Sequence, residues 1–165
     1  MNRRVVIALG ANLGTPARQL DAAWTEVCTA LQLQHPLLSS IFRSAPAEGA
    51  SGPDFANAVG LGYTTAGATE TLAVLHAIER RFGRDREREG HHGSRPLDLD
   101  LIDWGGAIMQ QEGLELPHPR AHRRAFVLRP LAELCADWRH PRLGVTPNDL
   151  LADLPPADRA SVLPW

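Results

Sequence analysis

The sequence predicts an α+β protein with an antiparallel sheet, and three observations support this prediction. Apolar and acidic residues alternate strictly from Leu97 to Leu101, which is the period of a strand with one buried face. Apolar residues recur at helical spacing in two stretches, 16–33 and 69–83. The predicted elements follow the order strand, helix, strand, strand, helix, strand, which is typical of a ferredoxin-like sheet with helices on one face.

The chain opens with a predicted strand, turn and helix. Residues 4–9 form an apolar run that indicates a buried strand, and a Gly-rich turn follows at 10–14. Such a turn either serves only the chain reversal or presents backbone N–H groups to phosphate. Thr15 as N-cap and Pro16 at the first helical position predict a helix over 16–33.

The middle of the chain predicts two more strands and a second helix. Residues 37–45 and 55–64 have strand composition, and a loop over 49–53 separates them. Thr69 is the expected cap of a helix that ends at Gly83. The alternating Leu and Asp residues then form the fourth strand.

The last third of the sequence predicts a helical and irregular extension. A short strand is expected near 107–109, an extended segment over 114–119, and a helix over 121–134 that Pro130 interrupts. Three further prolines predict an irregular surface strap at the C-terminus. The whole chain, 1–165, is expected to form one domain.

Composition excludes several classes of protein. A net charge of −2 argues against a broad nucleic-acid-binding face. All 17 basic residues are Arg, so a lysine-containing phosphate loop is excluded. Cys28 and Cys135 lie too far apart for a metal-binding motif. Because no apolar run approaches 18 residues, we expect no membrane span and a cytoplasmic location.

Asp98 and Asp100 are the strongest candidate metal ligands. On a strand their carboxylates leave the same face roughly 6–7 Å apart, which suits a pair of divalent ions. Six arginines lie between residues 80 and 95, interspersed with glycines. Carboxylates for a hard cation beside guanidinium groups for phosphate oxygens indicate a nucleotide-phosphate site. The alternative is a solvated strand face.

Several segments resemble the 6-hydroxymethyl-7,8-dihydropterin pyrophosphokinase family. The resemblance is most specific at residues 91–102 and extends in register over most of the chain. The similar segments are 8–14, 42–46, 53–58, 78–84, 91–102, 117–120 and 124–128. It implies ATP-dependent transfer of pyrophosphate to the hydroxymethyl oxygen of a reduced pterin, with release of AMP, in folate biosynthesis. The implied partners are these small molecules, without nucleic acid or membrane, and the implied state is a monomer or weak homodimer.

The resemblance also implies roles for individual residues. Asp98 and Asp100 would bind two Mg²⁺ ions. The implied phosphate-contacting and nucleotide-binding residues are His76, Glu79, Arg84, Arg86, Arg95, Ile102, His118 and Arg124. Those implied to bind the pterin are Ser44, Ala45, Phe55, Asn57, His92 and Phe126, with the two Phe rings stacking on its faces. The segment 85–93 would act as a lid, and His92 stands where the family often has Trp.

Alternatives remain for these residues and for the function. His76 and Glu79 are otherwise surface residues, Phe55 and Phe126 core residues, and His118 an exposed loop residue. The segment 85–93 is otherwise a charged loop without a catalytic part. One rival function is another two-metal enzyme, such as a nucleotidyl transferase or cyclase, which releases pyrophosphate. The other is an RNA-binding module on the same kind of sheet.

Overall fold

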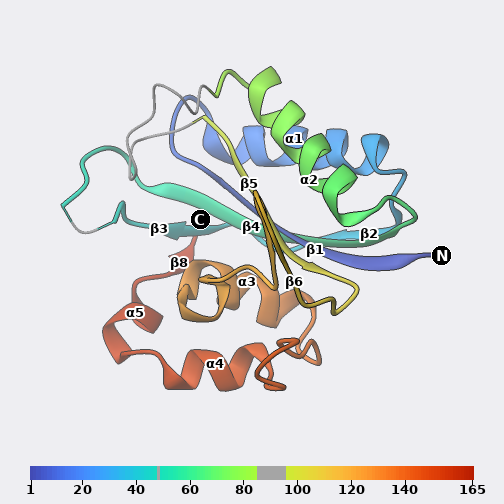
Figure 1. Ribbon diagram of the computed structural model, residues 1–165. Helices are drawn as coiled ribbons and strands as arrows, with labels where there is room; N and C mark the ends of the chain where they lie inside the picture. The colour runs from blue at the N-terminus through green and yellow to red at the C-terminus, as the bar shows by residue number, and fades with distance from the viewer. Residues whose placement is uncertain (48, 85–95) are drawn as a thin grey trace.

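The computed structural model describes residues 1–47, 49–84 and 96–165, and its largest element is a sheet of six strands (Figure 1). Five strands follow the order β5-β1-β4-β3-β8, and β2 also pairs with β4. Every pairing is antiparallel, so the predicted α+β class is confirmed. The strands of this sheet are β1 (Arg3–Ala11), β2 (Gln34–Leu38), β3 (Phe42–Ser44), β4 (Phe55–Thr64), β5 (Asp98–Trp104) and β8 (Leu163–Pro164).

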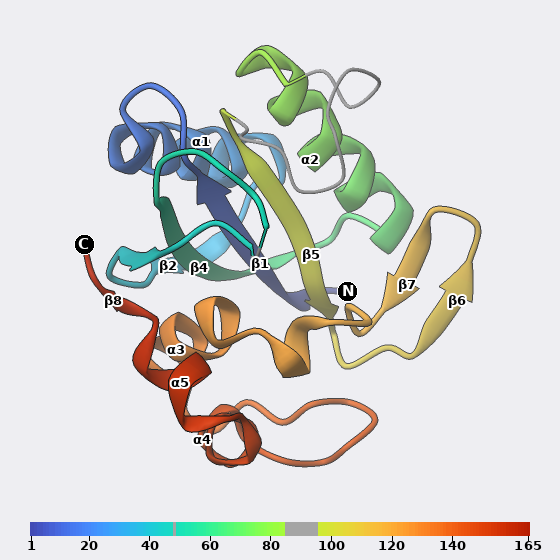
Figure 2. The same cartoon turned by 90° about the vertical axis from the view of Figure 1, so that its left-hand side faces the viewer.

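Helices cover both faces of the sheet, whereas the sequence predicted helices on one face (Figures 1 and 2). The helices α1 (Pro16–Ala30) and α2 (Ala68–Arg81) bury their apolar stripes against one face. The helices α3 (Ala125–Leu134) and α4 (Pro147–Asp153) cover the other. The two predicted core helices do lie on one face, and the C-terminal extension, whose place the sequence did not predict, covers the second face because β1 and β4 carry buried apolar residues on both faces.

The predicted strand over residues 37–45 is two strands. Its first part starts earlier, because a register shift at His35, with φ of 51°, lets Gln34 pair with Tyr63. Ser39 then binds Val59 through both its N–H and its hydroxyl. Beyond this point the chain continues as β3, the strand that carries Ser44.

Helix ends differ from the sequence prediction where local hydrogen bonds decide them. The second helix is capped at Gly67 and not at Thr69, because Glu70 accepts a bond from the Gly67 N–H and Thr71 donates to its carbonyl. The predicted helix over 121–134 is interrupted at Arg124 and not at Pro130. Arg124 has an extended backbone and lies between a 3-10 turn, η1 (Ala121–Arg123), and the helix α3. Pro130 lies inside α3, where it costs one backbone bond.

The C-terminal segment is ordered and not the irregular strap that its prolines predicted. Thr146 and Asp149 form a reciprocal capping box at the start of α4. Pro147 and Pro156 occupy the first positions of α4 and α5 (Pro156–Ala160), where a missing N–H has no cost.

Two short strands, β6 (Met109–Gln111) and β7 (Leu114–Leu116), form a separate hairpin. Among the described residues, no helix combines the length and apolar character of a membrane span.

Gly60 on β4 allows the Trp24 ring of α1 to lie directly on the sheet. A Cβ at position 60 would lie 2.3 Å from the nearest ring atom. We therefore expect Gly60→Ala to lower the free energy of unfolding by about 1–3 kcal/mol, measured by urea denaturation. Gly67→Ala is the control, because nothing lies within 4 Å of its added Cβ, and it should cost only the poorer helix cap, about 0.5–1 kcal/mol. Equal losses in the two variants would contradict this account.

Candidate active site

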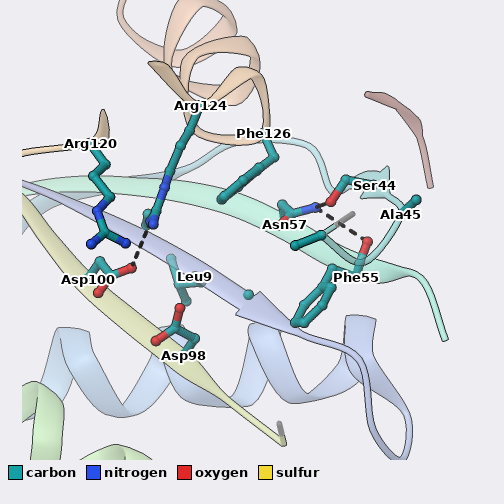
Figure 3. A pocket seen from close by; sticks show the side chains of 13 residues that line it. Leu9, Ser44, Ala45, Phe55, Asn57, Asp98, Asp100, Arg120, Arg124 and Phe126 are labelled. Carbon is teal, nitrogen blue, oxygen red and sulfur yellow. Dashed lines mark hydrogen bonds and ion pairs between the residues drawn. The ribbon is translucent and has the colours of Figure 1, made fainter. Parts of the chain in front are cut away.

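One cavity of about 290 Å³ lies over the ends of β1, β3, β4 and β5, beside the start of α3 (Figure 3). Eight of the residues that the sequence singled out line it. The full lining is Ala8, Leu9, Gly10, Ser44, Ala45, Ala47, Phe55, Asn57, Asp98, Asp100, Arg120, Arg124 and Phe126. The structure therefore brings the predicted acidic pair and the predicted ring-binding residues into one space.

The acidic pair faces this cavity because β5 alternates as its sequence predicts. Leu99 and Leu101 are buried in the core beneath α1 and α2. The side chains of Asp98 and Asp100 are 24% and 29% exposed and line the cavity on the opposite face. Their neighbours on β1 are Gly10 and Ala8, so small side chains leave the space above the carboxylates open.

Each carboxylate contacts a guanidinium group. Arg84 Nη1 lies 2.5 Å from Asp98 Oδ1, and Arg124 Nη1 lies 4.0 Å from Asp100 Oδ2. These two cations offset the repulsion between like charges on adjacent same-face positions. Figure 3 shows Arg120 and Arg124 reaching toward Asp100 from the side of the cavity opposite β5.

Glu79 on α2 organises the start of β5 from behind the cavity. Its Oε2 accepts bonds from the Leu99 N–H at 2.9 Å and from Arg84 Nη1 at 2.5 Å. The side chain is 1% exposed, so the surface alternative for Glu79 is wrong. Its carboxylate does not line the cavity but binds Arg84 and the backbone of β5.

The other half of the cavity combines an amide and two aromatic rings. Asn57 Nδ2 donates to Ser44 Oγ at 2.8 Å and, more weakly, to the carbonyls of Phe42 and Phe55. The Phe55 and Phe126 rings point into the same cavity from β4 and α3 (Figure 3). Phe126 is 37% exposed and neither ring belongs to a core cluster, so the core alternative is wrong for both.

His118 lies half-buried beside the cavity rather than in its lining. Its backbone N–H donates to the Ile102 carbonyl, and its ring Nδ1 accepts a bond from the backbone N–H of Arg120 at 3.1 Å. Burial, assisted by the nearby Arg124 guanidinium, lowers the pKa of His118 to about 4. The imidazole is therefore neutral near pH 7 with its proton on Nε2.

Other predicted residues lie elsewhere or outside the described ranges. Ile102 is a bulged residue of β5 whose side chain is buried in the second core, so only its backbone is left for a ligand. His76 is half-buried on α2 and does not line the cavity. Arg86, His92, Arg95 and the predicted lid over 85–93 lie outside the described residues.

Sequence reasoning missed five lining residues of the cavity, which are Arg120, Ala47 and the β1 residues Ala8, Leu9 and Gly10. The signals were present, because Arg120 closes the segment 117–120 that carried the family resemblance. Gly10 opens the turn that was weighed as a phosphate contact. Neither segment showed by itself which residue would face a ligand.

Comparisons with known proteins place this cavity in context. The model of the 7,8-dihydro-6-hydroxymethylpterin-pyrophosphokinase (HPPK) family matches residues 6–136. The chain is 39% identical over 141 residues to a 2-amino-4-hydroxy-6-hydroxymethyldihydropteridine pyrophosphokinase of Synechocystis, covering 86% of this chain and 71% of that protein. It is also 39% identical over 131 residues to the enzyme of the same name from Haemophilus influenzae, covering 79% and 81%.

Solved structures agree at the level of the fold. A crystal structure of Plasmodium falciparum HPPK-DHPS with STZ-DHP matches with a TM-score of 0.65 at 12% identity. The match covers 91% of this chain and 41% of that one, so this chain spans less than half of the solved protein. With the extent of the family match and the identity to its members, this chain belongs to the 7,8-dihydro-6-hydroxymethylpterin-pyrophosphokinase family.

Proposed function

We propose that this chain transfers the β,γ-pyrophosphate of ATP to the hydroxymethyl group of 6-hydroxymethyl-7,8-dihydropterin, releasing AMP, as a step of folate biosynthesis. The observation that carries the proposal is that one cavity joins an acidic pair and arginines to an amide and two aromatic rings. The first set suits a metal-bound polyphosphate, and the second suits a flat heterocycle with polar edges.

The pterin half of the cavity supplies stacking and an oriented amide. Phe55 and Phe126 would cover the two faces of the ring, as aromatic side chains do with flat ligands. The bond from Asn57 Nδ2 to Ser44 Oγ fixes the amide, and its Oδ1 lies 3.7 Å from where a Cβ on Gly10 would stand. Glycine at this position thus keeps room beside an acceptor for ring N–H groups. Ser44 and Ala45 would add backbone contacts.

The phosphate half has a donor set that fits magnesium. Asp98 and Asp100 offer partly exposed carboxylate oxygens, the ligand type that Mg²⁺ prefers, and phosphate oxygens and water would complete the coordination. When bound, two Mg²⁺ ions would neutralise the triphosphate and polarise the phosphorus that is attacked. Arg120 and Arg124, which line the cavity, would take up phosphate charge once the carboxylates bind metal. Arg84 is buried behind Asp98 and does not line the cavity, and its phosphate contact is what the family resemblance implies.

Positioning and electrostatics are the catalytic means that the described residues offer. Among the described lining residues, the only carboxylates are Asp98 and Asp100, and both are assigned to metal. We therefore derive no protein base for the hydroxyl group. Holding the hydroxymethyl oxygen in line with the phosphorus, among guanidinium groups, would supply most of the rate enhancement.

Further roles belong to the same proposal. His118, neutral with Nε2–H as a donor, would bind the nucleotide beside the Ile102 backbone, with His76 and Glu79 nearby. By family resemblance, Arg95 would contact phosphates, and a lid over 85–93 would bring Arg86 to the phosphates and His92 to the pterin. The chain would act as one domain, 1–165, on small molecules in the cytoplasm, as a monomer or weak homodimer.

Replacing either acid should abolish the release of AMP. We expect Asp98→Asn and Asp100→Asn each to lower the rate by at least about 100-fold, because an isosteric amide is a poor metal ligand. The measurement is chromatographic separation of AMP, ADP and pyrophosphate after incubation with ATP, Mg²⁺ and the dihydropterin. Asp21→Asn, on the exposed side of α1, is the control and should keep full activity. Release of free pyrophosphate would favour a nucleotidyl transferase instead.

Removing one stacking ring should weaken the binding of the pterin but not that of ATP. Phe55→Ala is expected to weaken dihydropterin binding by about 10-fold or more, because stacking contributes about 1–3 kcal/mol per ring. ATP binding should change less than about twofold, since the ring lies in the other half of the cavity. Isothermal titration of each ligand gives both values. Equal losses for ATP and the pterin would argue against stacking.

The half-buried imidazole of His118 should make the free energy of unfolding depend on pH. Its pKa is about 4 in the folded protein against 6.5 in the unfolded chain, so the unfolded state binds more protons between these values. Stability should therefore rise from pH 4 to pH 6.5, by about 1–3 kcal/mol from this residue after allowance for partial exposure. His118→Gln should flatten that rise in urea denaturation curves recorded across the window. If the free energies of unfolding of the two proteins change with pH in the same way, the pH dependence does not come from His118.

A further inference from the structure

A third apolar cluster lies directly behind the pterin half of the cavity. It consists of Phe42 from β3, Ala125 from the start of α3, and Val162 from the segment between α5 and β8. All three are buried, with Val162 only 1% exposed. The cluster therefore joins two walls of the cavity to the C-terminal segment.

The residues of this cluster are close in sequence to residues that line the cavity. Phe42 is two positions before Ser44 on the same face of β3, and its carbonyl accepts a bond from the Asn57 amide. Ala125 stands directly before Phe126, whose ring lines the cavity. Val162 itself does not line the cavity. Any contact that fixes Phe42 and Ala125 relative to each other also fixes the Ser44–Asn57 pair relative to the Phe126 ring.

Polar contacts hold the C-terminal segment in this place. Arg129 Nη1 donates to the Val162 carbonyl at 2.9 Å, and its guanidinium lies over the Phe42 ring. Strand β8 pairs with β3, and the Trp165 N–H donates to the Ile41 carbonyl at 3.0 Å. The Trp165 ring also stacks under the guanidinium of Arg43 at 4.3 Å. In Figure 1 this segment runs from α5 to the edge of the sheet beside β3.

We infer that Val162 is a positioning residue for the pterin site, through which the C-terminal segment sets the distance between the Phe126 ring and the Asn57 amide. The inference rests on the proposed function. It concerns a segment that lies beyond the family match, which ends at residue 136. Truncating Val162 removes the part of the packing between β3 and α3 that its side chain supplies, so both walls gain freedom and bind the ring less well.

Truncating Val162 should weaken the binding of the pterin and not that of ATP. Asp98 and Asp100 lie on β5, at the edge of the sheet opposite to β8. Arg124 is held by its own backbone, because its N–H donates to the Ala121 carbonyl and its carbonyl accepts bonds from Val127 and Leu128. The aspartates and the Arg124 backbone are therefore held by contacts that do not include Val162, and only the Arg124 guanidinium, which lies over the Phe126 ring, touches the pterin half.

The test compares Val162→Ala with Val27→Ala in the full chain. Both remove the same atoms from a buried site, but Val27 lies in α1 under the opposite face of the sheet. For Val162→Ala we expect the KM for 6-hydroxymethyl-7,8-dihydropterin to rise about 3- to 10-fold, with the KM for ATP and kcat within about twofold of the unsubstituted protein. For Val27→Ala all three constants should stay within about twofold.

A second variant covers the case in which Val162→Ala does not fold. Arg129→Leu keeps a helix-forming residue in α3 but removes the bond to the Val162 carbonyl, and it should raise the KM for the pterin in the same selective way. Unchanged pterin KM in both variants, or equal changes for pterin and ATP, would overturn this inference alone. Failure of the unsubstituted protein to turn over the dihydropterin would overturn the proposed function and this inference with it.

Discussion

The alternation of strand β5 is the constraint on which the cavity depends. Leu99 and Leu101, with Leu97 just before the strand, bury one face, so the two aspartates between them must leave the other. Two carboxylates on one face repel, and the strand tolerates them because Arg84 and Arg124 contact one each. Glu79 stabilises this arrangement from the core, since one carboxylate oxygen binds both the strand backbone and Arg84. A divalent ion at the aspartates would replace charge that the guanidinium groups already supply.

Strand β1 connects the two halves of the cavity. It pairs with β5 on one side and with β4 on the other, so the aspartates and Asn57 stand on strands that flank it. Gly10 pairs with Asp98 on one side and with Asn57 on the other. The distance between a metal-bound phosphate and a bound pterin would thus be set by the spacing of three hydrogen-bonded strands. A sheet supplies such a distance more rigidly than loops do.

Short-range patterns in the sequence predicted the elements whose packing is visible in their own alternation of residues. The period of residues 97–101 was enough to place both aspartates on one face, and the βαββαβ order predicted the strand arrangement. The second helical layer was missed, because β1 reads only as apolar and a run without alternation does not reveal that both faces need cover. The burial of Glu79 was also missed, since its partners lie 5 and 20 positions away in sequence. Pro156 was interpreted as part of an irregular tail, although proline is favoured at the first position of a helix, which is where it lies in α5.

The two halves of the cavity differ in what holds them. The phosphate half is held by charge, through Glu79, Arg84 and the aspartates, so its geometry responds to whatever cation is present. The pterin half is held by packing, because the ends of β3 and α3 meet over the small cluster that Val162 completes. Packing forces are short-ranged and do not depend on salt. In the proposed function, metal would replace guanidinium at the aspartates on one side while the packed walls around the heterocycle stay in place.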